Sequence, residues 1–317
     1  NDVGTAPVPP DTVFRVVRDI YANKLCPLRY RHQMSFASPA AFAQWAESDK
    51  KQCLCENDRL TLGPLKLFKD GSLGARTATM RQEYRDDPGN FGVEALSEAE
   101  MNAFCALADR YNMQVVTHAI GDKAISDTVG NYEAILREGK NPLRHGLIHC
   151  QITDLPLLER IGRDDLQAMV QPVFLDYDMH AVLSRCGEAL SSTSYAFASL
   201  KKLGARLSFG TDSPVEDCDP FANLYTAVTR KDHTGAPEGG FFPQECVDIY
   251  DAVDAYTLGS AHAEFREQDK GRLKPGYLAD FVVLDTDLFT CDPMDIRTAN
   301  PVLTVVGGEV AWRKETL

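Results

Sequence analysis

The chain has 317 residues, of which 44% are hydrophobic and 25% charged, and its formal net charge at pH 7 is -13. This length and composition suit a soluble globular protein with one large domain, alone or with a small second unit. The acidic balance argues against nucleic-acid binding, which needs a basic face, and the lack of a run of about 18 apolar residues argues against a membrane span.

The chain start and the cysteines bear on the compartment. The first residues are neither basic nor apolar, so they do not form a signal peptide, and no initiator Met is present. Nine cysteines are scattered without a CxxC pair, and the two-residue spacing of Cys53 and Cys55 is poor for a zinc finger. Cys150 is expected to be a buried structural thiol. Reduced thiols without a disulfide framework indicate a cytoplasmic protein.

Apolar stretches and helical patterns alternate along the chain. Helices are predicted from Asp11, from Pro39 after a Ser38 cap, from Ser97 with a capping box to Glu100, and over the periodic segments after residues 121, 154 and 194. Strands are predicted over residues 28–36, 62–68, 114–118, 146–149, 167–173 and 206–209. Such alternation implies parallel strands flanked by helices.

Two segments depart from this alternation. Residues 70–94 form a connection that is too long for a structural link and is typical of a functional loop. Near the end of the chain, residues 280–284, 302–306 and 309–312 predict short strands, and the last two are joined by a Gly307-Gly308 turn. We therefore expect an α/β domain over residues 1–265 and a small β unit over residues 266–317.

Four residues lie at or near the ends of predicted strands and form a candidate metal site: Lys66, His118, His149 and Asp212. Neutral imidazole and carboxylate groups suit zinc and similar divalent ions, and bound water loses its proton more easily. In this interpretation Asp212 takes the proton from the attacking water. The alternatives are histidines bonded to backbone and a Lys66 ion pair with Asp70 or Asp212, whereas a carbamate on Lys66 would bridge two metals.

Other polar residues are candidates for weaker reasons. Asp70 and Ser72 follow the strand that carries Lys66, so they can orient ligands or contact substrate. Arg76 can meet an anionic group from the long loop, and His180 can face a substrate, although a solvated side chain is the alternative for both. His32 and His145 are interpreted as structural, because they lie in the middle or at the start of their strands.

Five stretches together resemble the amidohydrolase superfamily, nearest to its N-substituted formamide deformylase branch. They are residues 66–78 (KLFKDGSLGARTA), 117–122 (THAIGD), 149–151 (HCQ), 210–216 (GTDSPVE) and 271–284 (GRLKPGYLADFVVL). The resemblance implies a metal-dependent (β/α)8 TIM barrel with a small β-sandwich built from both chain ends. It also implies that Lys66 is the carboxylated lysine and that His118, His149 and Asp212 are metal ligands. Zinc is the first expectation for one or two ions, with iron or manganese as alternatives.

The chain departs from the family pattern at its beginning. The family's first strand carries a His-x-His pair, and no His-x-His occurs in this chain. The six predicted strands then correspond to strands three to eight of an incomplete barrel. We expect the C-terminal portion of a longer polypeptide, with a missing N-terminal segment or a second copy of the chain as its partner.

The resemblance predicts an enzyme with Asp212 and His149 as catalytic residues. It would hydrolyse a non-peptide C–N bond, amide or formamide-like, in a small molecule through metal-activated hydroxide. The alternative from another class is a non-catalytic remnant of the fold that binds a ligand or partner. Hydrolysis of a lactone or phosphotriester on the same scaffold is a third reading, because fold alone does not decide the reaction.

Overall fold

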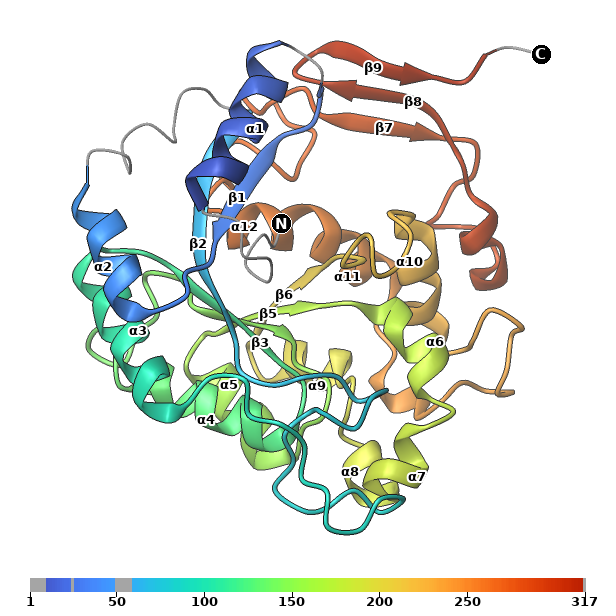
Figure 1. Cartoon of the computed structure of the whole chain (residues 1–317). Helices are drawn as coiled ribbons and strands as arrows, with labels where there is room; N and C mark the ends of the chain where they lie inside the picture. Colours follow the sequence, from blue (N-terminus) through green and yellow to red (C-terminus); the bar gives the residue numbers. More distant parts are fainter. Residues whose placement is uncertain (1–9, 24–25, 49–58, 316–317) are drawn as a thin grey trace.

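The architecture is that of an open, curved α/β half-barrel with a small second sheet (Figure 1). The computed structural model describes residues 10–23, 26–48 and 59–315. Six parallel strands pair in chain order: β1 (Tyr30–Met34), β2 (Leu60–Phe68), β3 (Val115–Ala119), β4 (Gly146–His149), β5 (Gln167–Val170) and β6 (Arg206–Phe209). The predicted parallel sheet is therefore confirmed, with the carboxyl ends of its strands at one edge.

Helices between the strands form an outer layer. The helices are α1 (Pro10–Ala22), α2 (Pro39–Glu47), α3 (Glu98–Arg110), α4 (Asp122–Glu133), α5 (Leu155–Arg163) and α9 (Phe197–Lys202). Successive helices from α2 through α5 to α9 pack against one another, as expected for helices that connect neighbouring parallel strands. The Ser38 cap and the Ser97–Glu100 capping box are both present, so local sequence determines where α2 and α3 begin.

The structure corrects several predicted boundaries. The strand predicted over 28–36 is limited to β1. Helix α1 begins at Pro10, so Asp11, which was predicted to cap this helix, lies within it. The strand predicted over 167–173 ends at Val170, because Pro172 cannot continue it and begins the 3₁₀ turn η2 (Pro172–Phe174). Residues 1–9, Cys53 and Cys55 lie outside the described residues, so the predictions made for them are not tested.

The region after β5 is more ordered than the sequence suggested. The segment 174–194, predicted as a polar stretch, contains α6 (Leu175–Asp178), α7 (Val182–Cys186) and α8 (Glu188–Ser191). Helices of four or five residues are too short to show an apolar period. Further elements that were not predicted are α10 (Pro220–Thr229), η3 (Pro243–Glu245), α11 (Ile249–Asp254), the π-helical turn η4 (Ala255–Gly259), α12 (Ser260–Ala263) and η5 (Pro293–Thr298).

A second sheet closes the chain. Strands β7 (Phe281–Leu284), β8 (Pro301–Val306) and β9 (Glu309–Arg313) pair antiparallel, as the sequence predicted. Gly307 and Gly308 join β8 to β9 with φ of 62° and 80°. Both values fall in the left-handed region that a tight hairpin turn requires and that glycine tolerates.

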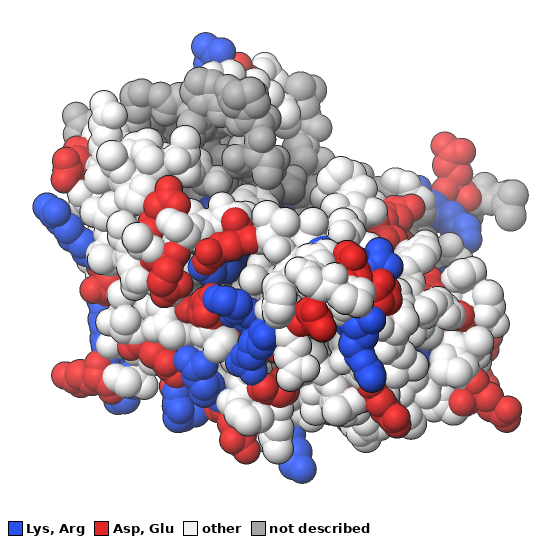
Figure 2. Space-filling model, turned by 60° about the horizontal axis from the view of Figure 1, so that its bottom comes forward, with Lys and Arg blue, Asp and Glu red and all other residues white. Residues whose placement is uncertain are grey.

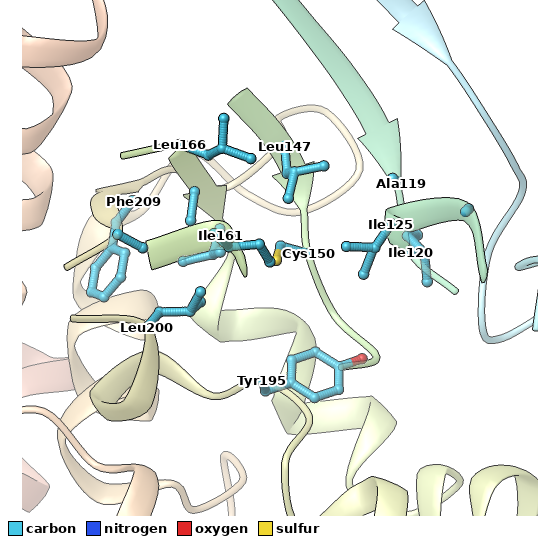
Figure 3. Packing of buried hydrophobic residues seen from close by; sticks show 14 of the residues in the cluster. Ala119, Ile120, Ile125, Leu147, Cys150, Ile161, Leu166, Tyr195, Leu200 and Phe209 are labelled. Carbon is cyan, nitrogen blue, oxygen red and sulfur yellow. The ribbon is translucent and has the colours of Figure 1, made fainter. Parts of the chain in front are cut away.

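The apolar core lies between the parallel sheet and the outer helices. Figure 3 shows Cys150 surrounded by the side chains of Ile125, Leu147 and Ile161. Cys150 is 1% exposed, and burial raises the pKa of its thiol to about 12. Cys150 is therefore a buried structural thiol, as expected. Within the described ranges, no helix combines the length and the apolar character needed to cross a membrane.

Candidate metal centre

Two histidines meet at the carboxyl edge of the half-barrel. His118 is in β3 and His149 ends β4, and the sheet register places Ala119 beside His149. Their ring centroids are 4.5 Å apart and the rings are nearly perpendicular, at 75°. Parallel pairing thus brings together two imidazoles that are 31 positions apart in the sequence.

The surroundings of His149 keep its ring neutral and fixed. The residue is 5% exposed, and burial lowers its pKa well below the usual value, with the His118 and Lys66 charges acting in the same direction. Its Nδ1 lies 2.8 Å from Oε1 of Gln171, and its ring stacks on Phe174 at 5.8 Å. A neutral imidazole is the form that binds a metal ion.

His118 is held by the start of the long loop. Its Nε2 lies 3.0 Å from the carbonyl oxygen of Gly71 and 3.5 Å from Oδ1 of Asp70. A carbonyl oxygen only accepts hydrogen bonds, so Nε2 of His118 is the nitrogen that carries a proton. In the neutral ring this leaves the lone pair on Nδ1.

Lys66 and Asp212 differ in exposure. Lys66 in β2 is 2% exposed, and its Nζ lies 4.4 Å from the centre of the Phe68 ring. Asp212 is exposed, on a turn after β6, with φ of 58°. Non-glycine residues in this conformation are uncommon and concentrate at functional sites. His149, with φ of 76°, has the same kind of backbone.

His118, His149 and Asp212 do not form a compact group of ligand atoms. In the part of the chain that the structure describes, the ligand atoms of His118, His149 and Asp212 are not all within 4.8 Å of one another. The group of three that is this compact consists of Glu94, Glu98 and Asp127. Glu94 and Glu98 of that group form ion pairs with the buried Lys69, at 2.6 and 3.4 Å.

The two imidazoles and the carboxylate are chemically suited to a divalent ion. The two imidazoles lie side by side, whereas the ligand atoms of all three residues do not form a group within 4.8 Å. The donor set therefore fits a metal ion in part, with the histidine pair as its fixed portion.

Asp70 has a structural role in the arrangement. It is 4% exposed, and its carboxylate accepts the backbone N–H groups of Thr79, Ile120 and Gly121 at 2.8 to 3.0 Å. Burial raises the pKa of Asp70 to about 7, against the opposing effect of these three hydrogen bonds. Asp70 thus ties the long loop to the end of β3 and touches His118 rather than open solvent.

The other substrate candidates have partners near their own loops. Ser72 is exposed and its Oγ accepts the N–H of Ala75. Arg76 binds both carboxylate oxygens of Asp86, at 3.1 and 2.8 Å. The side chain of His180 is 61% exposed, and its Nε2 lies 3.1 Å from Asp232. The structure does not bring these three to the histidine pair through any recorded contact.

The surface around the long loop carries both signs of charge. Figure 2 shows Lys and Arg side chains interspersed with Asp and Glu on the face that comes forward. The long loop itself forms two ion pairs, Arg76–Asp86 and Arg81–Asp154. Mixed charges of this kind favour solubility without selecting an anionic or cationic ligand.

Gln171 and Phe174 are site residues that the sequence analysis missed. The available signal was positional, since Gln171 directly follows the strand predicted to end at the same edge as His149. An amide side chain at a strand end has many structural uses, so only its contact with His149 identifies it.

Comparison with known proteins places this arrangement in context. The chain is 36% identical over 256 residues to Protein LONG AFTER FAR-RED 3 of Arabidopsis thaliana, which covers 79% of this chain and 43% of that protein. It is 24% identical over 254 residues to the N-substituted formamide deformylase of Arthrobacter pascens, covering 80% of this chain and 46% of the deformylase. The chain thus spans about half the length of these curated relatives.

A solved structure shares the fold. The crystal structure of an uncharacterized metal-dependent hydrolase from Pyrococcus horikoshii OT3 matches with a TM-score of 0.76 and 29% sequence identity, over 88% of this chain and 55% of that chain. The model of the amidohydrolase family matches residues 11–311, which include the parallel sheet, most of the second sheet and the histidine pair. Because the match extends over nearly the whole sequence, the chain belongs to the amidohydrolase family.

Proposed function

We propose that the protein is a divalent-metal-dependent hydrolase that cleaves a C–N bond other than a peptide bond in a small molecule. The observation that carries the proposal is the pair of imidazoles at adjacent strand ends, with ring centroids 4.5 Å apart. The low pKa of the buried His149 supports it, because a ring that stays neutral is ready to bind a cation.

The residues that would hold the ion are His118 through Nδ1, His149 through Nε2, Asp212 and Lys66. When bound, a divalent ion polarises a carbonyl oxygen and lowers the pKa of water. Zinc is the first candidate, with iron or manganese as alternatives, since imidazole and carboxylate suit all three. Addition of CO2 to the neutral Lys66 amine forms an N–C bond and releases a proton, which would give this residue an anionic end.

The chain's own groups account for positioning and proton transfer. Phe174 stacks on His149 and Phe68 lies beside Lys66, so aromatic surface limits the water around the site. Asp212, on its exposed turn, takes a proton from the attacking water and passes it to the leaving nitrogen. The C–N assignment is supported by family membership, and an amide or formamide-like substrate by the printed name of the Arthrobacter relative.

A metal measurement tests this proposal. Protein purified without chelator is expected to contain one or two equivalents of zinc, iron or manganese per chain by elemental mass spectrometry. His149→Ala should lose at least half of that metal, whereas His233→Ala, an exposed histidine paired with Asp176, should retain it. Asp212→Asn should reduce turnover of small amides by at least about 100-fold, because the general base is lost.

The outcome that contradicts the proposal is metal at background level in the wild type, or equal metal content in the wild type and His149→Ala.

One observation favours a second function, a non-catalytic remnant that binds a ligand or partner. The ligand atoms of His118, His149 and Asp212 are not all within 4.8 Å of one another. In that case the chain binds no stoichiometric metal, and Asp212→Asn leaves every measurable property of the site unchanged.

A further inference from the structure

We propose that Gln171 and Phe174 form a positioning pair that fixes His149 in the tautomer protonated at Nδ1, so that the lone pair of the neutral ring is on Nε2. Both residues lie on the turn after β5, which carries none of the four predicted ligands. The inference deepens the proposed function and rests on it, because metal binding is the role proposed for the Nε2 lone pair.

The hydrogen bonds of Gln171 determine which way its amide points. The Nε2 amide group lies 3.2 Å from the carbonyl oxygen of Met169 and must donate there, because a carbonyl oxygen cannot donate. Oε1 is therefore the atom that faces His149, at 2.8 Å from Nδ1. A carbonyl-type oxygen only accepts, so Nδ1 of His149 is the donor and carries the proton.

Because both partners are buried, this hydrogen bond determines the tautomer of His149. Gln171 is 8% exposed and His149 is 5% exposed, so water does not readily replace the amide as partner of Nδ1. A buried N–H without an acceptor costs about 1–3 kcal/mol. The opposite tautomer would place a lone pair against Oε1 and leave the proton on Nε2, where a metal ligand must be unprotonated.

Phe174 fixes the plane of the ring. Its ring stacks on His149 with a centroid distance of 5.8 Å and an interplanar angle of 17°. The turn η2 that carries Phe174 is anchored by the N–H of Val173, which donates to Oδ1 of the fully buried Asn223 at 2.8 Å. The imidazole is thus restrained by a hydrogen bond at one edge and by a stacked ring on one face.

The backbone of His149 makes such restraint necessary. His149 and Cys150 have φ of 76° and 51°, two consecutive non-glycine residues in the left-handed region. This bend turns the chain sharply out of β4, and it is retained only where surrounding contacts hold it. Mutation of a side chain that contacts a metal ligand typically weakens metal affinity by about 10–100-fold.

Nuclear magnetic resonance of the metal-free protein tests the tautomer directly. With ¹⁵N-labelled histidine at pH 8, the long-range ¹H–¹⁵N pattern of His149 is expected to show protonated Nδ1, and the signal is assigned by its loss in His149→Asn. Gln171→Met keeps the side-chain length and removes the acceptor, so the pattern should change to a mixture of tautomers. Gln171→Glu keeps an acceptor and should preserve the Nδ1–H form.

Zinc titration against a competing chelator gives the second readout. Gln171→Met should weaken zinc binding by about 10–100-fold, and Gln171→Glu should restore it to within about threefold of the wild type. Phe174→Leu removes the stacking ring and keeps the hydrogen bond. It should retain the Nδ1–H pattern, weaken zinc binding less than Gln171→Met, and provide the test of the pair if Gln171→Met does not fold.

The inference is overturned if wild-type His149 shows protonated Nε2, or if folded Gln171→Met keeps the Nδ1–H pattern and binds zinc within about twofold of the wild type. Retention of wild-type zinc affinity by Phe174→Leu would remove Phe174 from the pair. Because the tautomer is read without metal, a wild-type protein that binds no zinc would count against the proposed function and not against the Gln171–His149 contact.

Discussion

Buried histidines show how the same residue type serves different ends in this molecule. His145 is 2% exposed, its Nδ1 accepts the N–H of Val115 at 3.0 Å, and its ring stacks on Tyr132 at 5.4 Å. His32 is 1% exposed and contacts Tyr30 through Nδ1. Burial lowers the pKa of each ring to about 4. Both have contacts within the core, consistent with the structural roles expected from their places in the strands.

The pKa of His145 predicts a dependence of stability on pH. Because its pKa is about 4 in the folded protein and about 6.5 in the unfolded chain, the unfolded state binds more protons between these values. The contribution of the neutral His145 ring to the free energy of unfolding is fully present above pH 6.5. It is lost as the pH falls to 4, by up to about 3 kcal/mol. Denaturant unfolding at pH 7.5 and 5 should show a smaller loss in His145→Gln than in the wild type. Equal losses in the two proteins would contradict the assignment.

At the scale of elements, the long loop packs closely against the start of α4. The N–H of Gly121 donates to Asp70 at 2.8 Å, and a Cβ at Gly121 would lie 2.1 Å from the carbonyl oxygen of Thr79. Two backbones approach so closely here that no side chain fits. The loop that supplies the Gly71 carbonyl to His118 is therefore held in place by contacts distant from the site.

Gly121→Ala should consequently destabilise the protein by about 2 kcal/mol or more and make the 70–94 loop sensitive to protease. Gly130→Ala is a matched control in the same helix, because its nearest foreign atom would be 3.8 Å away, on the flexible Arg160 side chain. It should stabilise the protein by about 0.5–1 kcal/mol through helix propensity. Thermal unfolding with limited proteolysis distinguishes the two, and similar behaviour of both variants would refute the close-approach argument.

At the scale of the whole molecule, charged side chains join the two sheets. Arg29, just before β1, binds both carboxylate oxygens of Asp280, at 2.6 and 3.1 Å, and Asp280 also accepts the N–H of Gly307. The side chain of Arg29 is 9% exposed. Arg59 reaches Glu309 at 3.2 Å, where the carboxylate side chain is 81% exposed. The first of these contacts is shielded from water and the second is not.

Asp280→Asn should therefore loosen the small sheet from the half-barrel. Removing one partner of a shielded ion pair leaves the other charge poorly compensated. Hydrogen exchange in β7–β9 should accelerate by at least about tenfold, with little change in β3 and β4. Glu309→Gln, at the exposed pair of the same junction, should change exchange by less than about threefold. Equal acceleration in both variants, or none in Asp280→Asn, would show that other contacts join the sheets.

Much of the architecture was predictable because it depends on short-range rules. The six parallel strands follow from apolar runs separated by helical patterns, and the Ser38 and Ser97 starts follow from side chains that cap nearby N–H groups. The short helices of segment 174–194 were not predictable, because their sequences lack a period and their packing supplies the stability. The strand predicted over 167–173 was too long for another reason, because Pro172 cannot continue it and begins a 3₁₀ turn.

The sequence by itself determined the parallel strands, the glycine hairpin and the presence of His118 and His149 at strand ends, because spacing and turn residues act locally. Only the tertiary structure decided that the two rings are neighbours, that Asp70 is buried against three N–H groups, and that Asp212 remains on an exposed turn. It also decided that Gln171 faces His149. These features depend on sheet curvature and on contacts between segments far apart in the chain, and no local pattern encodes such distances.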